Sequence, residues 1–240
     1  MAKHLTGTHN YAEFKPDTVR ERVNSMVGTR NTLSTTDLHV KLSYGNRKTG
    51  ALVPSVSLIP VADCGNCGLC ARGCYAVRHI CCYRESREML ANNSALWRED
   101  PGRYMAEIRD YVKFLRFFRW HASGDIKDFQ YLTCMVSIAE HTPTCEFLAF
   151  TKMYDLVNNY LKNVGSFPKN LHIIFSDWRG AEFENPYNLP VSSPLWKDGT
   201  KGPHCTDNVH MCEGNCSDCA KVLCGCWSAG PGDTILFDAH

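Results

Sequence analysis

The stretch "RFFRWHASGDIKDFQYLTCMVSIAEHTPTCEFLAFTK", residues 116–152, carries the pattern that decides the fold. Apolar and aromatic residues over 116–120 and 145–150 predict two strands, and the amphipathic spacing over 126–141 predicts a helix between them. A strand, a helix and a second strand in this order favour parallel pairing through a right-handed crossover. The stretch therefore predicts an α/β fold built on a parallel sheet.

The same alternation extends in both directions along the chain. Further strands are expected over 55–62 and 171–175, and further helices over 84–100, 102–115 and 153–164. Four such strands fit an open parallel sheet or a partial (β/α) barrel, because a closed barrel of eight strands needs a longer chain.

Length and composition are typical of a globular domain. The chain has 240 residues, 44% of them hydrophobic and 21% charged, and its net charge is +1. We expect one α/β domain over residues 48–240, preceded by an N-terminal arm over 1–47. The small net charge does not indicate a nucleic acid partner. Without a bilayer-spanning apolar run or a secretion signal, we expect no membrane contact and a cytoplasmic location.

The chain has 14 cysteines, and most of them lie in two groups. In a reducing cytoplasm, clustered cysteines favour metal binding over disulfides. The first group reads Cys64-x2-Cys67-x2-Cys70-x3-Cys74. This is the cysteine spacing of bacterial ferredoxins, with Tyr75 in place of the usual proline. It predicts an iron–sulfur cluster, of the 4Fe-4S type.

The second group lies near the C-terminus and supplies six further candidate metal ligands: Cys205, Cys212, Cys216, Cys219, Cys224 and Cys226. Four thiols suffice for a second 4Fe-4S cluster or, as an alternative, for a tetrahedral zinc site. We expect this segment, residues 205–226, to fold back on the carboxyl ends of the strands. The stretch at 234–237 predicts a short strand at the edge of the sheet.

Polar residues follow several of the predicted strands, where the ligands of parallel α/β folds bind. Catalytic roles are predicted for His121, Asp125 and Lys152, and cofactor-binding roles for Ser123, Ser176 and Asp177. Turn formation and helix capping are the competing structural explanation for the same residues. Because the segments come from several strand ends, we expect them to meet at one rim of the sheet.

Several motifs together resemble a known family. "KTGALVPSVSLIPVADC", "CARGCYA", "FRWHASGDI", "FTK", "IIFSDW" and the C-terminal cysteines are similar to the uncharacterised gene product 88 family of phages and prophages, from about Lys48 to Trp227. A more distant likeness joins the chain to radical S-adenosylmethionine enzymes, whose signature is C-x3-C-x2-C. Here Cys70 and Cys74 match that signature, and Val77 stands in its third position. This likeness implies a partial barrel and S-adenosylmethionine as a further cofactor.

These observations predict an iron–sulfur protein with one or two clusters. The favoured function is a redox or radical-type enzyme that acts on a small molecule at the cluster. One alternative is a carrier of electrons or clusters that serves an electron-transfer partner. The others are a zinc-stapled binding module and a purely structural cluster.

Overall fold

The computed structural model describes most of the chain, with gaps near its N-terminus and in the first cysteine group: residues 21, 23, 37–45, 50–65, 67, 68, 70, 71 and 74–239. Most of the expected arm, residues 1–47, lies outside this part. Residues 37–45 nevertheless contact the domain, because Leu38 and Val40 are buried in its largest apolar cluster and Ser43 pairs with Ser55 in an antiparallel bridge.

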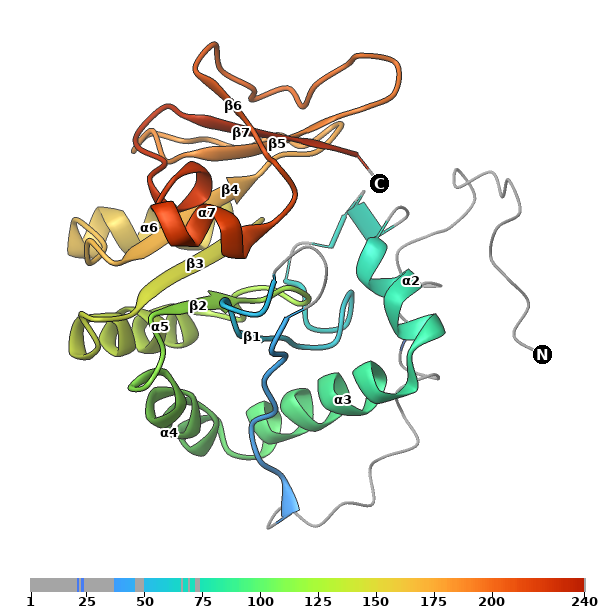
Figure 1. Cartoon of the computed structure of the whole chain (residues 1–240), viewed down its shortest axis with the longest axis vertical. Helices are drawn as coiled ribbons and strands as arrows, with labels where there is room; N and C mark the ends of the chain where they lie inside the picture. The colour runs from blue at the N-terminus through green and yellow to red at the C-terminus, as the bar shows by residue number, and fades with distance from the viewer. Residues whose placement is uncertain are drawn as a thin grey trace.

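Seven strands form one sheet, and every neighbouring pair is parallel (Figure 1). The strands are β1 (Ser55–Val56), β2 (Phe117–Trp120), β3 (Glu146–Thr151), β4 (Leu171–Ser176), β5 (Val191–Leu195), β6 (Val209–Met211) and β7 (Thr234–Asp238). Their order is β1-β2-β3-β4-β5-β7-β6, so β1 and β6 are the edges and the sheet does not close. The expected open parallel sheet or partial barrel is confirmed.

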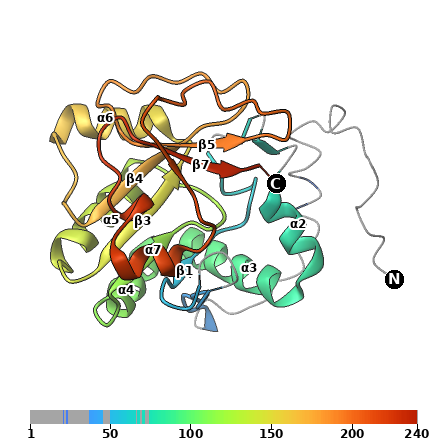
Figure 2. The ribbon, with the colours of Figure 1, turned by 45° about the horizontal axis from the view of Figure 1, so that its top comes forward.

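The sequence pattern underestimates the number of strands. It does not predict β5 and β6, because β5 contains a proline and β6 is only three residues long. The predicted strand at 234–237 exists as β7, which lies beside β5 (Figure 2). It is wrongly placed at the edge, since β6 pairs with its other side.

The predicted first strand, 55–62, is also too long. Only Ser55 and Val56 pair with β2. Beyond them the Leu58 amide donates to the Ser123 carbonyl, and Pro60 has no amide to donate. The chain therefore leaves the sheet early and turns into the first cysteine group.

Four helices cover one face of the sheet: α3 (Arg84–Glu99), α4 (Pro101–Val112), α5 (Phe129–His141) and α6 (Tyr154–Val164). They match the four predicted helices within a few residues. The Asp100 and Asp128 carboxylates cap α4 and α5 by accepting from the Arg103 and Tyr131 amides. A further helix, α2 (Tyr75–Cys82), follows the first cysteine group and is not predicted by its sequence pattern.

Side-chain alternation along β2 divides the core into two clusters. Phe118 and Trp120 face the covering helices, whereas Phe117 faces the opposite side with Leu148 of β3 and Ile174 of β4. On that opposite side they pack against the C-terminal segment, which contains α7 (Cys216–Val222) and the short helix η5 (Gly225–Trp227). The sheet is thus buried on both faces, as parallel sheets are.

The C-terminal cysteine segment folds back on the sheet as expected, but it lies over the sheet face rather than at the rim. Trp227 of η5 packs on Phe117 and His172, which stand at the beginnings of β2 and β4, at ring distances of 5.2 and 6.1 Å. Burial of this indole against the apolar face explains the position.

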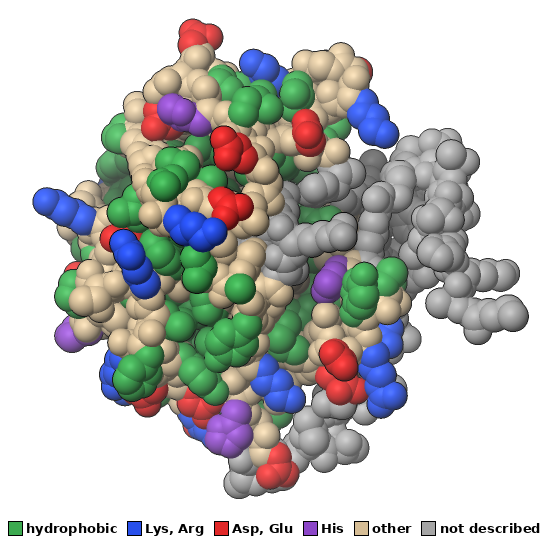
Figure 3. Space-filling model, viewed as in Figure 1, with side chains coloured by type: hydrophobic (Ala, Val, Ile, Leu, Met, Phe, Trp, Pro, Cys, Tyr) green, Lys and Arg blue, Asp and Glu red, His purple; other side chains and the backbone are tan. Residues whose placement is uncertain are grey.

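Acidic and basic side chains are interspersed on the face shown in Figure 3. In the part of the chain that the structure describes, no helix has the length and apolar character that a membrane crossing requires.

Candidate functional site

Hydrogen bonds connect the segments that follow three adjacent strands. The Asp125 carboxylate, after β2, accepts from the Thr151 hydroxyl at 2.6 Å and from the Lys152 amide at 2.9 Å, both at the end of β3. The Lys152 ammonium donates to the Ser176 hydroxyl at the end of β4, at 2.9 Å. The expected meeting of these segments at one rim is therefore observed.

Asp125 holds this rim together. It is buried, and burial raises the pKa of its carboxyl group, while hydrogen bonds from the Thr151 hydroxyl and the Lys152 and Ile126 amides oppose the rise. Three donors from its own protein occupy the carboxylate. Asp125 is thus placed to fix the position of Lys152.

The four cysteines after β1 lie close together beside this rim. Hydrogen bonds with the thiols of Cys64 and Cys70, followed by burial, raise the pKa of Cys67. Burial raises the pKa of Cys74 to about 11, and the Cys64 and Cys70 thiols add to the rise. All four members of the first predicted ligand set therefore belong to one group, which we call the rim thiols.

Cys70 links the rim thiols to the polar rim. Its hydrogen bond with Cys67 lowers the pKa of Cys70 to about 7 against the effect of burial, and the Lys152 ammonium favours the thiolate while the Asp125 carboxylate opposes it. A predicted metal ligand and two predicted catalytic residues thus lie within electrostatic range of one another.

A cavity of about 170 Å³ opens where the rim thiols meet the loop after β4. Its described lining consists of Cys67, Gly68, Cys70, Lys152, Tyr154, Trp178, Arg179, Gly180, Ala181 and Glu182. The Lys152 ammonium lies 5.9 Å from the centre of the Trp178 ring. The cavity thus combines thiols, a cation and an aromatic wall, and its volume suits a small molecule.

His121 is not among the described residues that line this cavity. It has a positive φ of 53° and is buried between β2 and α5, where Nε2 lies 2.8 Å from the Tyr131 hydroxyl. Burial, followed by the charges of Lys127 and Arg119, lowers the pKa of His121 to about 3. The side chain is neutral and directed into the core.

The three predicted cofactor-binding residues have different surroundings. The Ser123 hydroxyl donates to the Leu58 carbonyl at 2.8 Å. Asp177 is fully buried and accepts from the amides of Trp178 and His204. Ser176 alone is joined to the cavity, through its hydrogen bond with Lys152.

Five of the six C-terminal cysteines gather on the opposite face of the sheet. Burial raises the pKa of Cys219 to about 12, and the thiols of Cys224, Cys212 and Cys216 add to the rise. Burial also raises the pKa of Cys226, again with Cys216 and Cys212 nearby. The Cys205 thiol instead donates to the Thr206 carbonyl oxygen, at 3.6 Å.

Tyr75 lies within electrostatic range of Arg119 and of thiols from both groups. The Tyr75 hydroxyl donates to the Ala122 carbonyl, and the Arg119 guanidinium donates to the Cys216 sulfur at 3.9 Å. Desolvation raises the pKa of Tyr75, and the nearby Arg119 guanidinium opposes this rise. The thiols of Cys74, Cys64 and Cys216 raise the pKa further. Thiols of both groups therefore lie within electrostatic range of this phenol.

Ligating geometry for a single metal ion is not found in the described ranges. No three histidine, cysteine, aspartate or glutamate side chains there stand close enough to hold one. Asn66, Leu69, Arg72 and Gly73 of the first cysteine group lie outside those ranges.

Sequence reasoning missed two contributors to this region. Arg119 is a charged residue inside an otherwise apolar strand, two positions from Phe117, and the period of two predicts that both face the same side. The loop 179–182 follows a predicted strand end, but its residues have no pattern that marks a cavity wall.

Comparison with known proteins gives a family and no closer relative. A sequence model of the family described as Gene product 88 matches residues 26–182. This range includes the rim thiols and the rim from Asp125 to Asp177, and it ends before the C-terminal cysteines. No curated protein and no solved structure matches the chain.

Proposed function

The chain belongs to the gene product 88 family, and we propose that it is an iron–sulfur protein whose rim thiols hold a cluster beside the cavity. The observation that carries this proposal is the shared lining: Cys67 and Cys70 border the same small cavity as Lys152 and Trp178. A substrate in this cavity would touch the thiol group itself.

The donor set fits such a cluster. Thiolates are the usual ligands of iron–sulfur clusters, and the spacing of the four cysteines is that of bacterial ferredoxins. Hydrogen bonding of Cys67 to both Cys64 and Cys70 keeps three of the sulfurs in one group, at a spacing wider than a single metal ion requires. A bound cluster supplies single-electron transfer, and its potential depends on the hydrogen bonds and burial around the sulfurs.

The protein's own residues then bind and orient a small molecule. The Lys152 ammonium attracts a carboxylate or phosphate group, and Asp125 and Ser176 hold that lysine in place. Trp178 forms an apolar wall that excludes water from one side. These features favour a redox or radical-type enzyme over a carrier, which needs no cavity for a substrate.

Anaerobic purification followed by iron, zinc and sulfide analysis tests the cluster. We expect iron and sulfide together with a broad visible absorbance, reduced in a Cys70→Ala/Cys74→Ala variant and unchanged in Cys134→Ala, which removes a thiol on α5 outside both groups. Zinc without sulfide, unaffected by the double substitution, would contradict the proposal.

Product analysis separates the enzyme from the carrier. Under reducing conditions, formation of 5′-deoxyadenosine from added S-adenosylmethionine would identify the radical branch, and Lys152→Met should reduce it while the cluster absorbance persists. For a carrier we expect no 5′-deoxyadenosine, and electron exchange with a soluble acceptor at the same rate in wild type and Lys152→Met.

A further inference from the structure

Four of the C-terminal thiols face one apolar cluster on the sheet. The cluster includes Phe117, Leu148, Ile174 and Trp227, and the thiols packed against it are Cys212, Cys216, Cys219 and Cys226. Cys224 is exposed and is not part of this packing, although its thiol is hydrogen-bonded to that of Cys219. The surroundings therefore divide the six predicted C-terminal ligands into an inner four and two others, Cys205 and Cys224.

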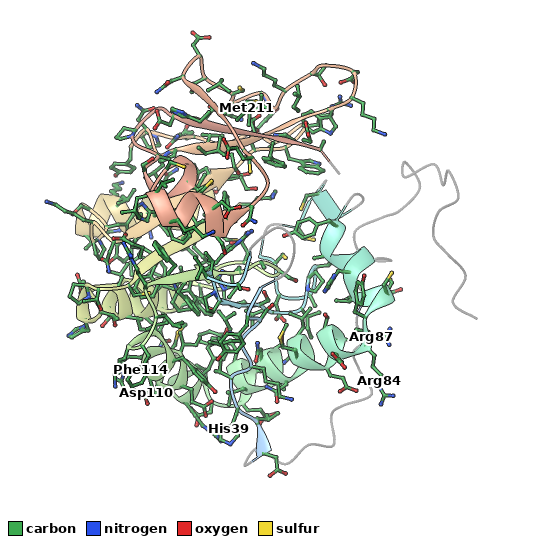
Figure 4. All side chains as sticks on the ribbon, viewed as in Figure 1. His39, Arg84, Arg87, Asp110, Phe114 and Met211 are labelled. Carbon is green, nitrogen blue, oxygen red and sulfur yellow. The ribbon has the colours of Figure 1, made fainter. Side chains whose placement is uncertain are left out.

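Local backbone structure explains why the inner four converge. Cys212 directly follows β6, whose last residue, Met211, is labelled in Figure 4. Cys216 and Cys219 are three residues apart on α7 and so share one side of that helix.

A reversal of the chain brings the fourth thiol back. After α7, Leu223 and Gly225 have positive φ angles of 50° and 57°, and the Cys224 amide donates to the Cys219 carbonyl. The chain thus turns back so that the Cys226 thiol interacts electrostatically with those of Cys216 and Cys212.

Arg119 supplies an independent observation. Its guanidinium donates to the Cys216 sulfur at 3.9 Å and lies 4.9 Å from the centre of the Phe150 ring. Its Nε is buried and has no hydrogen-bond partner among the residues that the structure describes. Within the described ranges no carboxylate forms an ion pair with it.

A cation in this position requires a compensating negative charge. A partly buried guanidinium among neutral thiols and aromatic rings loses hydration without gaining an ion pair. Four thiolates around a 4Fe-4S cluster carry a net negative charge. Metal binding by the neighbouring thiols would therefore provide the charge that Arg119 lacks.

We propose that the inner four thiols form a second metal centre, separate from the rim thiols, with the Arg119 guanidinium as its counter-charge: Cys212, Cys216, Cys219 and Cys226. Each thiol releases its proton on binding the metal. No three of these side chains stand close enough to hold one Zn²⁺ ion, so the set suits a 4Fe-4S cluster, in which each thiolate binds a separate iron. This centre does not depend on the proposed function of the rim.

Metal analysis of the rim variant tests the proposal directly. The Cys70→Ala/Cys74→Ala variant leaves the C-terminal segment intact, so its metal content reports on the second centre alone. We expect it to keep about four iron and four sulfide per chain. A rim variant that folds but holds no iron and sulfide would overturn the proposal.

Single cysteine variants test the ligand assignment in the same rim-variant background. We expect Cys216→Ser and Cys219→Ser to lose the retained metal, and Cys205→Ala and Cys224→Ala to keep it. Equal loss in Cys224→Ala would overturn the assignment. If the proposed function of the rim fails instead, the wild type and the rim variant hold the same metal.

The rate of metal release to a chelator tests the role of Arg119. Residues that contact metal ligands without binding the metal change metal affinity by about 10- to 100-fold when replaced. We expect Arg119→Gln to release the C-terminal metal to a chelator at least about tenfold faster than the parent, and Arg119→Lys to restore most of the difference. Equal release rates for the parent and Arg119→Gln would remove Arg119 from the centre.

Discussion

The two thiol groups carry cysteines at similar spacings but have opposite surroundings. The rim thiols border a cavity and lie within range of a lysine and an aspartate at the carboxyl ends of the strands. The C-terminal thiols pack against aromatic and aliphatic side chains on the sheet face, where the Arg119 guanidinium donates to the Cys216 sulfur. Spacing alone does not distinguish these two environments.

The difference indicates a division of roles. A group beside a cavity can meet a small molecule, whereas a group sealed against the sheet contributes mainly to folding. The carboxyl rim of a parallel sheet is where ligands bind, and the packed face is where burial stabilises the fold. We therefore expect substitutions on the face to affect stability, and substitutions at the rim to affect chemistry.

Replacing Trp227 by alanine tests the face and should have the largest effect. Its indole is 3% exposed, lies against Phe117, and donates to the Cys216 carbonyl at 3.3 Å. Loss of so large a buried side chain leaves a cavity, so we expect the free energy of unfolding to fall by about 3–5 kcal/mol. Denaturant titration monitored by circular dichroism measures the change.

Trp178→Ala is the matched control at the rim. This indole is partly exposed and lines the cavity, so we expect a loss of roughly 1 kcal/mol or less. Equal losses of stability in the two variants would contradict the division between rim and face.

His121 tests where the rim site ends. Burial keeps this imidazole neutral, with a pKa of about 3 against 6.5 for the ordinary group. Between these values the unfolded chain binds a proton that the folded protein does not, so His121 lowers stability as the pH falls through this range. Asparagine does not titrate and accepts a positive φ.

We therefore expect the unfolding free energy of His121→Asn to fall less than that of the wild type between pH 6.5 and about 4.5. The difference between the two proteins should change by about 2 kcal/mol over this window. Denaturant titrations at several pH values measure it, and His141→Asn, which removes an exposed histidine of α5, is the control. Parallel pH profiles for wild type and His121→Asn would show that the imidazole is accessible to protons, as a rim residue is.

The sequence pattern predicts much of the sheet, the covering helices and the polar rim, and there are physical reasons why it does not predict the rest. Strand and helix periods identify β2, β3, β4 and the covering helices because each buries a regular apolar stripe. They also place Asp125 and Lys152 at one rim, since parallel strands end on the same side. They overextend β1, where the chain leaves the sheet after Val56, and they miss β5, whose proline weakens the strand pattern.

The direction of a side chain at a strand end does not follow from the strand period. His121 follows a strand directly, yet its positive φ turns the imidazole into the core rather than toward the cavity. The C-terminal segment carries no strand or helix period long enough to indicate which face it covers. Its position depends on Trp227 meeting Phe117 from a distant part of the chain, a contact that local pattern does not encode.

Asn215 tests how the face positions its thiols. Its side-chain oxygen accepts from the Ser217 amide at 2.9 Å and caps α7, which carries Cys216 and Cys219. Asn215→Ala should lower the unfolding free energy by about 1 kcal/mol. It should also weaken metal binding by the C-terminal thiols and leave the metal content of the rim thiols unchanged. Asn163→Ala, which removes an exposed amide of α6, is the control. Loss of rim metal in Asn215→Ala would show that the two groups are not separate.

Lys152 tests the rim itself and should have the smallest effect on stability. Its ammonium lines the cavity and donates to Ser176, and the side chain is partly exposed, so Lys152→Met should change the unfolding free energy by about 0.5 kcal/mol or less. Because the substitution removes the cation that is proposed to hold a substrate, activity at the cavity should be lost while both metal contents persist. Metal analysis and denaturant titration of one preparation measure the metal content and the unfolding free energy of Lys152→Met. A loss above about 2 kcal/mol would instead make Lys152 a structural residue that ties β3 to β4.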